Sequence, residues 1–318
     1  MWLEALLADR SLASALALLL ALGLDKALGE PSRCHPLVVF GNLAQYIERR
    51  CRAMVCLSEK QQGALAWSFA VLPPVLLCFG ACHWLLVRSP LAWFVASSLI
   101  LYLSMGGRSL SEHAQQIYRP LQQGDMAQAR YQLAQIVSRD TERMDATAIS
   151  SSTIESVLEN GNDAVIAPML WFVLLGAPGA LLFRLANTLD AMWGYKTSQY
   201  LEFGYVSARL DDLLAWLPAR LTALSYAVQG DFKLALQCWQ QQARHCASPN
   251  GGVTMTSGAG ALGISIGGPT YYHGVLHQKP PMGHGPLSPP QAIPRAIALV
   301  ERGCIGLALV WLIWLLAC

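Results

Sequence analysis

The chain has 318 residues, of which 54% are hydrophobic and only 13% are charged, and its mean hydropathy is +0.36. Because a soluble domain has about 25% charged residues, this composition indicates an integral membrane protein. The formal net charge of +2, without a long basic run, argues against a protein that binds nucleic acid.

Five apolar runs predict membrane spans. A helix needs roughly 20 apolar residues to cross about 30 Å of hydrocarbon. We place the spans at about 9–28, 64–87, 89–107, 164–186 and 303–318. The predicted fold class is all-α: a polytopic helical bundle with the whole chain, 1–318, as a single membrane-embedded domain. Polar segments, helical or Gly-rich, lie between the spans at 29–63, 108–163 and 187–302.

The positions of Lys and Arg predict the orientation in the membrane. Residues 25–63 hold six of these side chains and residues 106–163 hold five, whereas the turn between the second and third spans holds only Arg88. Cytoplasmic loops carry such an excess, so we expect both segments in the cytoplasm and the N-terminus outside. A full crossing by 164–186 would place residues 187–212 on the opposite side. We therefore interpret this run, which Gly176-Ala-Pro-Gly179 interrupts, as a re-entrant helical hairpin.

The polar segment 108–163 is predicted to be helical and to carry an acidic face. Asp140-Thr141 is the expected N-cap of a helix that runs to about residue 160. On it Glu155 and Glu159 share one face, and Asp163 lies one turn further. Like charges at this spacing repel, so a divalent cation or nearby arginines must compensate; an ordinary solvated acidic face is the alternative.

Residues 187–220 place ionisable groups among apolar residues close to the predicted bilayer. Charges in such surroundings are costly, which makes them candidates for function. An ion pair between Arg209 and Asp212 is the structural alternative. The polar runs are Asn187-Thr-Leu-Asp190, Gly194-Tyr-Lys196, Arg209-Leu-Asp211-Asp212 and Pro218-Ala-Arg220.

The segment 232–300 contains no Asp or Glu, but it contains four cations and a small-residue stretch from Ser248 to Pro269. We expect a Gly-rich loop with exposed backbone N–H groups, which suits an anionic ligand; a flexible loop without a ligand is the alternative. The glycines at 258, 260 and 263 lack the βαβ context of a dinucleotide site. The Gly- and Pro-rich surroundings of His273 and His277 argue against a metal site there. Nine cysteines without a C-x-x-C pair argue against a zinc ribbon or a disulfide framework.

Taken together, these motifs resemble a known family over about residues 20–275. In chain order they are Asp25, Gly29-Glu-Pro31, His35-Pro36, Gly107-Arg108-Ser-Leu-Ser-Glu-His113, Arg139-Asp-Thr141, Ile154-Glu-Ser156, Glu159-Asn160, Asp163, Ala167-Pro168, Asn187-Thr-Leu-Asp190, Gly194-Tyr-Lys196, Ala208-Arg-Leu-Asp-Asp212, Pro218-Ala-Arg220, Ser248-Pro-Asn250-Gly251 and Gly267-Gly-Pro269. This order is similar to that of the adenosylcobinamide-phosphate synthase family of cobalamin biosynthesis.

The resemblance implies an enzyme of the inner membrane. It would join the free propionate of adenosylcobyric acid, a corrinoid, to aminopropanol or its O-phosphate through an amide bond. ATP would drive the reaction, with Mg²⁺ as the expected cofactor and the active site in the cytoplasm. Other membrane enzymes of the same pathway are possible partners, besides the lipid bilayer; nucleic acid is not.

Residue chemistry assigns hypothetical roles within that reaction. An acyl-phosphate route needs Mg²⁺ and cations around the transferred phosphate. The candidates for Mg²⁺ are Glu155, Glu159, Asp163, Asp190, Asp211 and Asp212. Those for phosphate, carboxylate or substrate are His35, Arg108, Arg139, Asn160, Asn187, Lys196, Arg209, Arg220, Asn250 and Gly251. The catalytic candidates, including a base for the amine, are His113, Glu155, Glu159 and Asp212.

Three departures from the family pattern bear on activity. This chain has Ala191 where the family commonly has Ser, Ala215 where it has Asn, and no acidic residue at 253–256. Two other functions therefore stay open: a membrane protein that binds or transports a corrinoid or another anion, and a catalytically impaired relative that supports a complex. A transporter would place its charges within spans, often in two repeated halves, and this sequence does neither, which favours the enzyme.

Overall fold

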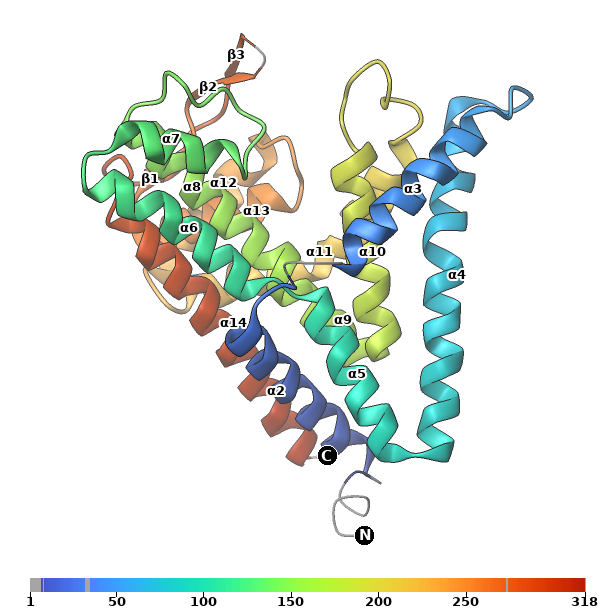
Figure 1. Cartoon of the computed structure of the whole chain (residues 1–318). Helices are drawn as coiled ribbons and strands as arrows, with labels where there is room; N and C mark the ends of the chain where they lie inside the picture. The colour runs from blue at the N-terminus through green and yellow to red at the C-terminus, as the bar shows by residue number, and fades with distance from the viewer. Residues whose placement is uncertain (1–6, 8, 32–34, 273, 318) are drawn as a thin grey trace. The chain divides into compact units, whose positions relative to one another are not determined.

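Helices make up most of the computed structural model, which describes residues 7, 9–31, 35–272 and 274–317 (Figure 1). The first part of the chain forms α2 (Arg10–Leu28), α3 (Pro36–Arg52), α4 (Glu59–Arg88), α5 (Pro90–Ser104), α6 (Gly107–Gln122) and α7 (Met126–Ala134). The middle forms α8 (Ala146–Gly161), a π-helical turn (Asn162–Ile166), α9 (Ala167–Leu175), α10 (Ala177–Trp193) and α11 (Tyr205–Ala227). The last part forms α12 (Phe232–Gln242), a 3₁₀ turn (Ala243–His245), α13 (Gly251–Leu262) and α14 (Ala292–Ala317).

Two small antiparallel sheets, which the sequence did not predict, lie between α13 and α14. Strand β1 (Ser265–Ile266) pairs with β4 (Met282–Gly283), and β2 (Pro269–Tyr272) pairs with β3 (Val275–Gln278) as a hairpin. Helices otherwise account for the regular structure of the described residues, so the predicted all-α class is confirmed.

Four helices are long and apolar enough to cross a membrane. They are Arg10–Leu28, Glu59–Arg88, Pro90–Gln122 and Ala292–Trp314. These helices cover four of the five predicted spans, apart from residues at the two ends of the chain.

The remaining predicted span is broken where the sequence indicated. Gly176, with a φ of +70°, separates α9 from α10. A Cβ on Gly179 would collide with the carbonyl oxygen of Trp171, so the two helices pack closely just beyond the break. Ala167 and Phe183 lie in one buried cluster, as in a helical hairpin. The path of this pair through the membrane stays a prediction.

The chain divides into two compact units. Unit 1 comprises Met1–Gly106, Ala167–Ala215 and Val310–Cys318, and unit 2 comprises Gly107–Ile166 and Trp216–Leu309.

Unit 1 is built around α3, α4 and α10. The ring of His35 accepts the N–H of Leu37 at the start of α3, and Pro36 occupies the first turn, where its missing N–H costs nothing. Ser58 and Gln61 cap the start of α4 reciprocally. The apolar faces of the three helices then bury one cluster, which includes Phe40, Ala44, Trp67, Ala70, Leu189, Trp193 and Phe203.

Unit 2 contains a helix, α13, whose every residue is buried. The prediction of an exposed Gly-rich loop is therefore wrong for Gly251–Leu262. Helices α8 and α12 approach α13 so closely that only small residues fit between them. A Cβ on Gly260 would lie 2.8 Å from the Cα of Ala235 on α12, and a Cβ on Gly258 would lie 2.5 Å from the side chain of Leu158 on α8. Close packing offsets the low helix propensity of glycine. The stretch becomes irregular only after Gly263.

The predicted start of the acidic helix is also wrong. Asp145, not Asp140, caps α8, because its carboxylate accepts the N–H of Ala148 at 2.7 Å. The carboxylate of Asp140 instead accepts the N–H of Gly274 at 2.7 Å and so holds the β2–β3 hairpin. The sequence around Asp140 gave no indication of this long-range contact.

Candidate functional site

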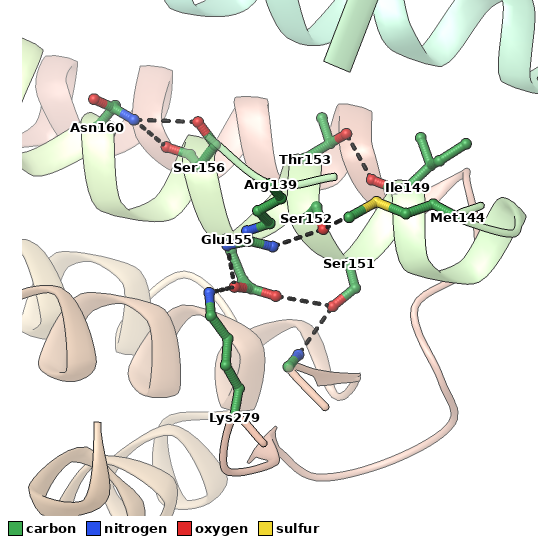
Figure 2. Close-up of polar contacts among 11 residues, drawn as sticks. Arg139, Met144, Ile149, Ser151, Ser152, Thr153, Glu155, Ser156, Asn160 and Lys279 are labelled. Carbon is green, nitrogen blue, oxygen red and sulfur yellow. Dashed lines mark hydrogen bonds and ion pairs between the residues drawn. The ribbon is translucent and has the colours of Figure 1, made fainter. Parts of the chain in front are cut away.

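Glu155 of α8 forms the centre of a buried ionic cluster in unit 2 (Figure 2). One oxygen of its carboxylate, Oε2, lies 2.7 Å from Nη2 of Arg139 and 3.0 Å from Nζ of Lys279. The side chain of Glu155 is only 3% exposed, against 10% for Arg139 and 26% for Lys279. Burial opposes ionisation of Glu155, but the two cations outweigh it and lower the pKa of the carboxyl. The charge of Glu155 on the predicted acidic face is thus compensated by an arginine and a lysine.

Hydroxyl groups on α8 complete this cluster. Ser151 donates to Oε1 of Glu155 at 3.1 Å and accepts the N–H of Gly267 at 2.9 Å. Arg139 donates from Nη1 to Ser152 at 2.6 Å. The three residues Arg139, Glu155 and Lys279 together carry one more positive than negative charge. Because only Lys279 is appreciably exposed, the surplus charge can meet an anion from solvent there.

The Ser248–Gly251 motif is held at the start of α13, in the same unit. Arg220 of α11 donates to the side-chain oxygen of Asn250 and, at 3.3 Å, to the carbonyl of Pro249. Its guanidinium carbon also lies 4.7 Å from the centre of the Trp216 ring. The hydroxyl of Ser248 accepts the N–H of Gly251 at 2.9 Å. Two motifs about 30 residues apart in sequence therefore form one structure.

Glu159 connects the motif with the Glu155 cluster. It lies one turn beyond Glu155 on α8, and a Cβ on Gly251 would collide with its carboxylate. A side chain at position 251 would therefore displace the carboxylate of Glu159. The thiol of Cys246 lies in the field of both glutamates and Lys279; burial first, then Glu155, raises its pKa. The predicted residues Arg139, Glu155, Glu159, Arg220, Asn250 and Gly251 thus gather in one region of unit 2.

A second group of predicted residues gathers in unit 1, on α10 and α11. Asn187 donates to a carboxylate oxygen of Asp211 at 3.3 Å. Burial, and then the charge of Asp212, raises the pKa of Asp190 to about 6. Burial also raises the pKa of Asp212, while Arg209 and Lys196 act in the opposite direction. Two carboxylates therefore share a partly buried place with two cations nearby.

Asp163 lies in the π-helical turn after α8. Its carboxylate accepts from Asn162, whose own oxygen accepts from the hydroxyl of Thr222 at 2.9 Å. The buried phenol of Tyr226 donates to the carbonyl of Leu158 at 3.2 Å. Burial and the nearby Asp163 raise the pKa of that phenol. Asn162, missed in the sequence, thus joins this turn to α11.

Four other predicted residues lie on α6, on α8 and at the start of α3. Arg108 pairs with Glu112 one turn along α6 at 2.6 Å, and His113 lies exposed on the same helix. Asn160 is exposed and donates to the carbonyl of Ser156 on its own helix at 2.9 Å. His35 caps α3 in unit 1.

The sequence also missed a buried glutamate in unit 1. Glu48 of α3 accepts from the indole of Trp193 at 2.9 Å and from Arg52 at 2.8 Å. Arg52 lies over the ring of Phe203, 4.0 Å from its centre, and donates to the carbonyl of Gln199 at 3.0 Å. This network ties the segment between α10 and α11 to α3. A single Glu within an amphipathic helix offered no local signal for it.

Among the described residues, no three or more His, Cys, Asp or Glu side chains lie together as a metal-binding group. His273 lies outside the described residues. Of the three departures from the family pattern, Ala215 is buried with Ala167 and Phe183, and residues 253–256 are buried within α13. Ala191 is exposed on α10.

Candidate membrane spans and buried ionic clusters together define a helical integral membrane protein with charge-lined polar sites. The chain belongs to the CobD/CbiB family: the family described as "CobD/Cbib protein" matches residues 18–300. The family expected from the motifs is confirmed.

Several curated relatives are similar over nearly their whole length. The chain is 48% identical to "Cobalamin biosynthesis protein CobD" of Chromobacterium violaceum over 290 residues, which cover 91% of this chain and 93% of the relative. The protein of that name from Stutzerimonas stutzeri is 47% identical, with 93% and 95% covered. The one from Clostridium perfringens is 36% identical, with 82% and 84% covered. No solved structure shows a significant match.

Proposed function

We propose that this protein acts in cobalamin biosynthesis and forms the amide bond between adenosylcobyric acid and (R)-1-amino-2-propanol or its O-phosphate, driven by ATP. The names of the relatives support the pathway. The cationic surplus of the Arg139–Glu155–Lys279 cluster, beside the Ser248–Gly251 motif, is the observation that carries the reaction class. ATP, the free propionate of adenosylcobyric acid and the phosphate of aminopropanol phosphate all carry negative charge.

The chemistry explains why such a cluster is needed. A carboxylate is a poor electrophile, so its oxygen first attacks the terminal phosphorus of ATP, and ADP leaves. The neutral amine then attacks the carbonyl carbon of the acyl phosphate, and phosphate leaves as the amide forms. Negative charge must be held in place in both steps, which preorganised cations do best in surroundings with little water.

We assign different tasks to the members of the cluster. Lys279 is the most exposed of the three and contacts the phosphate or the propionate. Glu155 holds Lys279 and Arg139 in position, since its carboxylate already has two cationic partners. Glu159, which lies against the Cα of Gly251, takes the proton that the amine loses. Arg220 keeps the Asn250 amide oriented.

The donor set in unit 1 fits Mg²⁺ better than Glu155 does. Asp190 and Asp212 are carboxylates that repel each other, and a divalent cation would remove that repulsion. When bound, Mg²⁺ would act as a Lewis acid at this group of carboxylates. Binding is testable without turnover: Mg²⁺ should raise the melting temperature of the wild type and have less effect on Asp190→Asn. Because ATP is cytoplasmic, we place the active site on that side of the inner membrane.

The test uses the full-length protein, purified in detergent or nanodiscs. It is supplied with adenosylcobyric acid, ATP and Mg²⁺, and with either aminopropanol or its phosphate, and the amide is measured by mass spectrometry. Lys279→Gln should reduce turnover about 10²-fold or more. Lys233→Gln, an exposed change at the start of α12, is the matched control and should leave turnover unchanged. Folded wild type that neither forms amide nor consumes ATP refutes the proposal; corrinoid binding without ATP consumption would instead identify a binding or transport protein.

A further inference from the structure

Helix α3 presents an apolar stripe that no other described part of unit 1 covers. Val39 is 63% exposed, and Leu43 and Tyr46 are each 48% exposed. These residues are spaced i, i+4 and i+7, so they lie along one side of the helix. The opposite side, with Phe40 and Ala44, is buried in the unit 1 core. The helix therefore has two apolar sides, and only one of them is used for packing within this unit.

The exposed side changes character along the helix. Its N-terminal half is apolar, whereas Arg49 and Arg50 lie exposed in the last turn. Arg50 donates to the phenol of Tyr46 at 3.1 Å and lies 5.1 Å from the centre of that ring. Tyrosine and arginine with apolar stems and polar tips are typical of the region where acyl chains give way to headgroups.

Helix α3 packs against a candidate membrane span. The helix packs along the N-terminal half of α4 (Figure 1), in one cluster with Trp67, Ala70 and Val71. Helix α4 carries no Asp, Glu, Lys or Arg between Lys60 and Arg88, and it is a candidate span. The other candidate span of this region, α2, ends at Leu28, just before α3. The membrane that receives α4 therefore reaches the exposed side of α3.

We propose that α3 lies in the membrane interface. Val39 and Leu43 contact acyl chains, and Arg49 and Arg50 bind the phosphates of anionic phospholipids. Helices that combine an apolar side with basic residues bind membranes in this way, through buried apolar area and attraction to anionic headgroups. The proposal is independent of the reaction that the protein catalyses.

Photo-crosslinking tests the apolar contact. p-Benzoylphenylalanine is introduced at Val39 or Leu43 of the full-length protein, in proteoliposomes that contain phosphatidylglycerol. Leu77, 74% exposed on α4, is the positive control, and Tyr131, 60% exposed on α7, is the negative control. Positions 39 and 43 should crosslink to phospholipid as position 77 does. A crosslink to a second copy of the chain, or no lipid adduct while position 77 gives one, overturns the proposal.

Lipid titration tests the arginines. Phosphatidylglycerol added to detergent-solubilised protein should raise its melting temperature, and the lipid concentration for half of the effect should rise about fivefold for each arginine removed. Arg49→Gln and Arg50→Gln are compared with Lys233→Gln, which lies in unit 2 and should behave as wild type. Equal titrations for all of these proteins would show that Arg49 and Arg50 bind no anionic lipid.

Discussion

Replacing Glu155 by glutamine is the sharpest test of the buried cluster in unit 2. The substitution keeps the shape of the side chain but removes its charge, so Arg139 and Lys279 remain as two buried or half-buried cations without a counter-charge. Breaking a buried ion pair on one side costs about 3–5 kcal/mol. Because Lys279 is 26% exposed and Arg139 is 10% exposed, water relieves part of this cost, and we expect a loss of about 3 kcal/mol.

Lys279→Gln is the informative comparison. It leaves Glu155 paired with Arg139 at 2.7 Å, so the cluster becomes neutral rather than doubly positive. We expect a stability loss of about 1 kcal/mol, the value of a partly solvated pair, together with the large loss of turnover stated above. Thermal unfolding in detergent, followed by tryptophan fluorescence, measures the stabilities. If Glu155→Gln is as stable as the wild type, or if Lys279→Gln is the more damaging change to stability, the charge accounting is refuted.

The same cluster predicts a pH dependence. The pKa of Glu155 is lower in the folded protein than its ordinary value of 4.5, so the folded state binds the proton less tightly than the unfolded state does. Its contribution to stability is therefore present above about pH 4.5 and is lost as the pH falls through the folded pKa. Glu155→Gln should show a smaller acid-side loss than the wild type; an identical acid profile would argue against an ionised Glu155.

Three further predictions concern other parts of the molecule. Asp190→Asn should raise the melting temperature at pH 7, because the buried charge of Asp190 costs up to about 3 kcal/mol. The wild type should gain stability as the pH falls from 7 through about 6, and Asp190→Asn should show a smaller gain. An unchanged pH profile would exclude Asp190 as the titrating group. Gly260→Ala should cost about 1–3 kcal/mol by overpacking, since its Cβ would lie 2.8 Å from the α12 backbone. Gly306→Ala, with nothing within 4 Å of its Cβ, should not lower the melting temperature; equal melting temperatures for the two variants would contradict this. Glu48→Gln should loosen the segment between α10 and α11, seen as faster trypsin cleavage after Lys196 at unchanged cleavage elsewhere; uniform protection would show that Glu48 does not hold it.

Composition and periodicity were sufficient for the large-scale description. A run such as that of α4, uncharged between Lys60 and Arg88, can only be covered by apolar surroundings, so its length and hydropathy are enough to predict a span. The break at Gly176 was predictable for a similar local reason: the glycine adopts a φ of +70°, which other residues rarely do. The order of short polar motifs was also sufficient to predict the family.

Predictions from local sequence patterns were wrong where a segment's structure depends on contacts with residues far away in the chain. The Gly-rich sequence of α13 looked like a loop because glycine weakens an isolated helix, and only the close neighbours α8 and α12 make that helix favourable. The sequence predicted Asp140 as a helix cap, but its carboxylate accepts a hydrogen bond from the backbone N–H of Gly274, 134 residues away.

The acidic face of α8 shows most clearly which features the sequence determines and which ones depend on tertiary structure. The spacing of Glu155 and Glu159 determined, by itself, that two like charges share one side of a helix and need compensation. Which compensation Glu155 receives was decided only by tertiary structure, which brings Lys279 to it across 124 residues. Periodicity acts over a few residues, whereas charge pairing in a protein interior depends on which helices pack together.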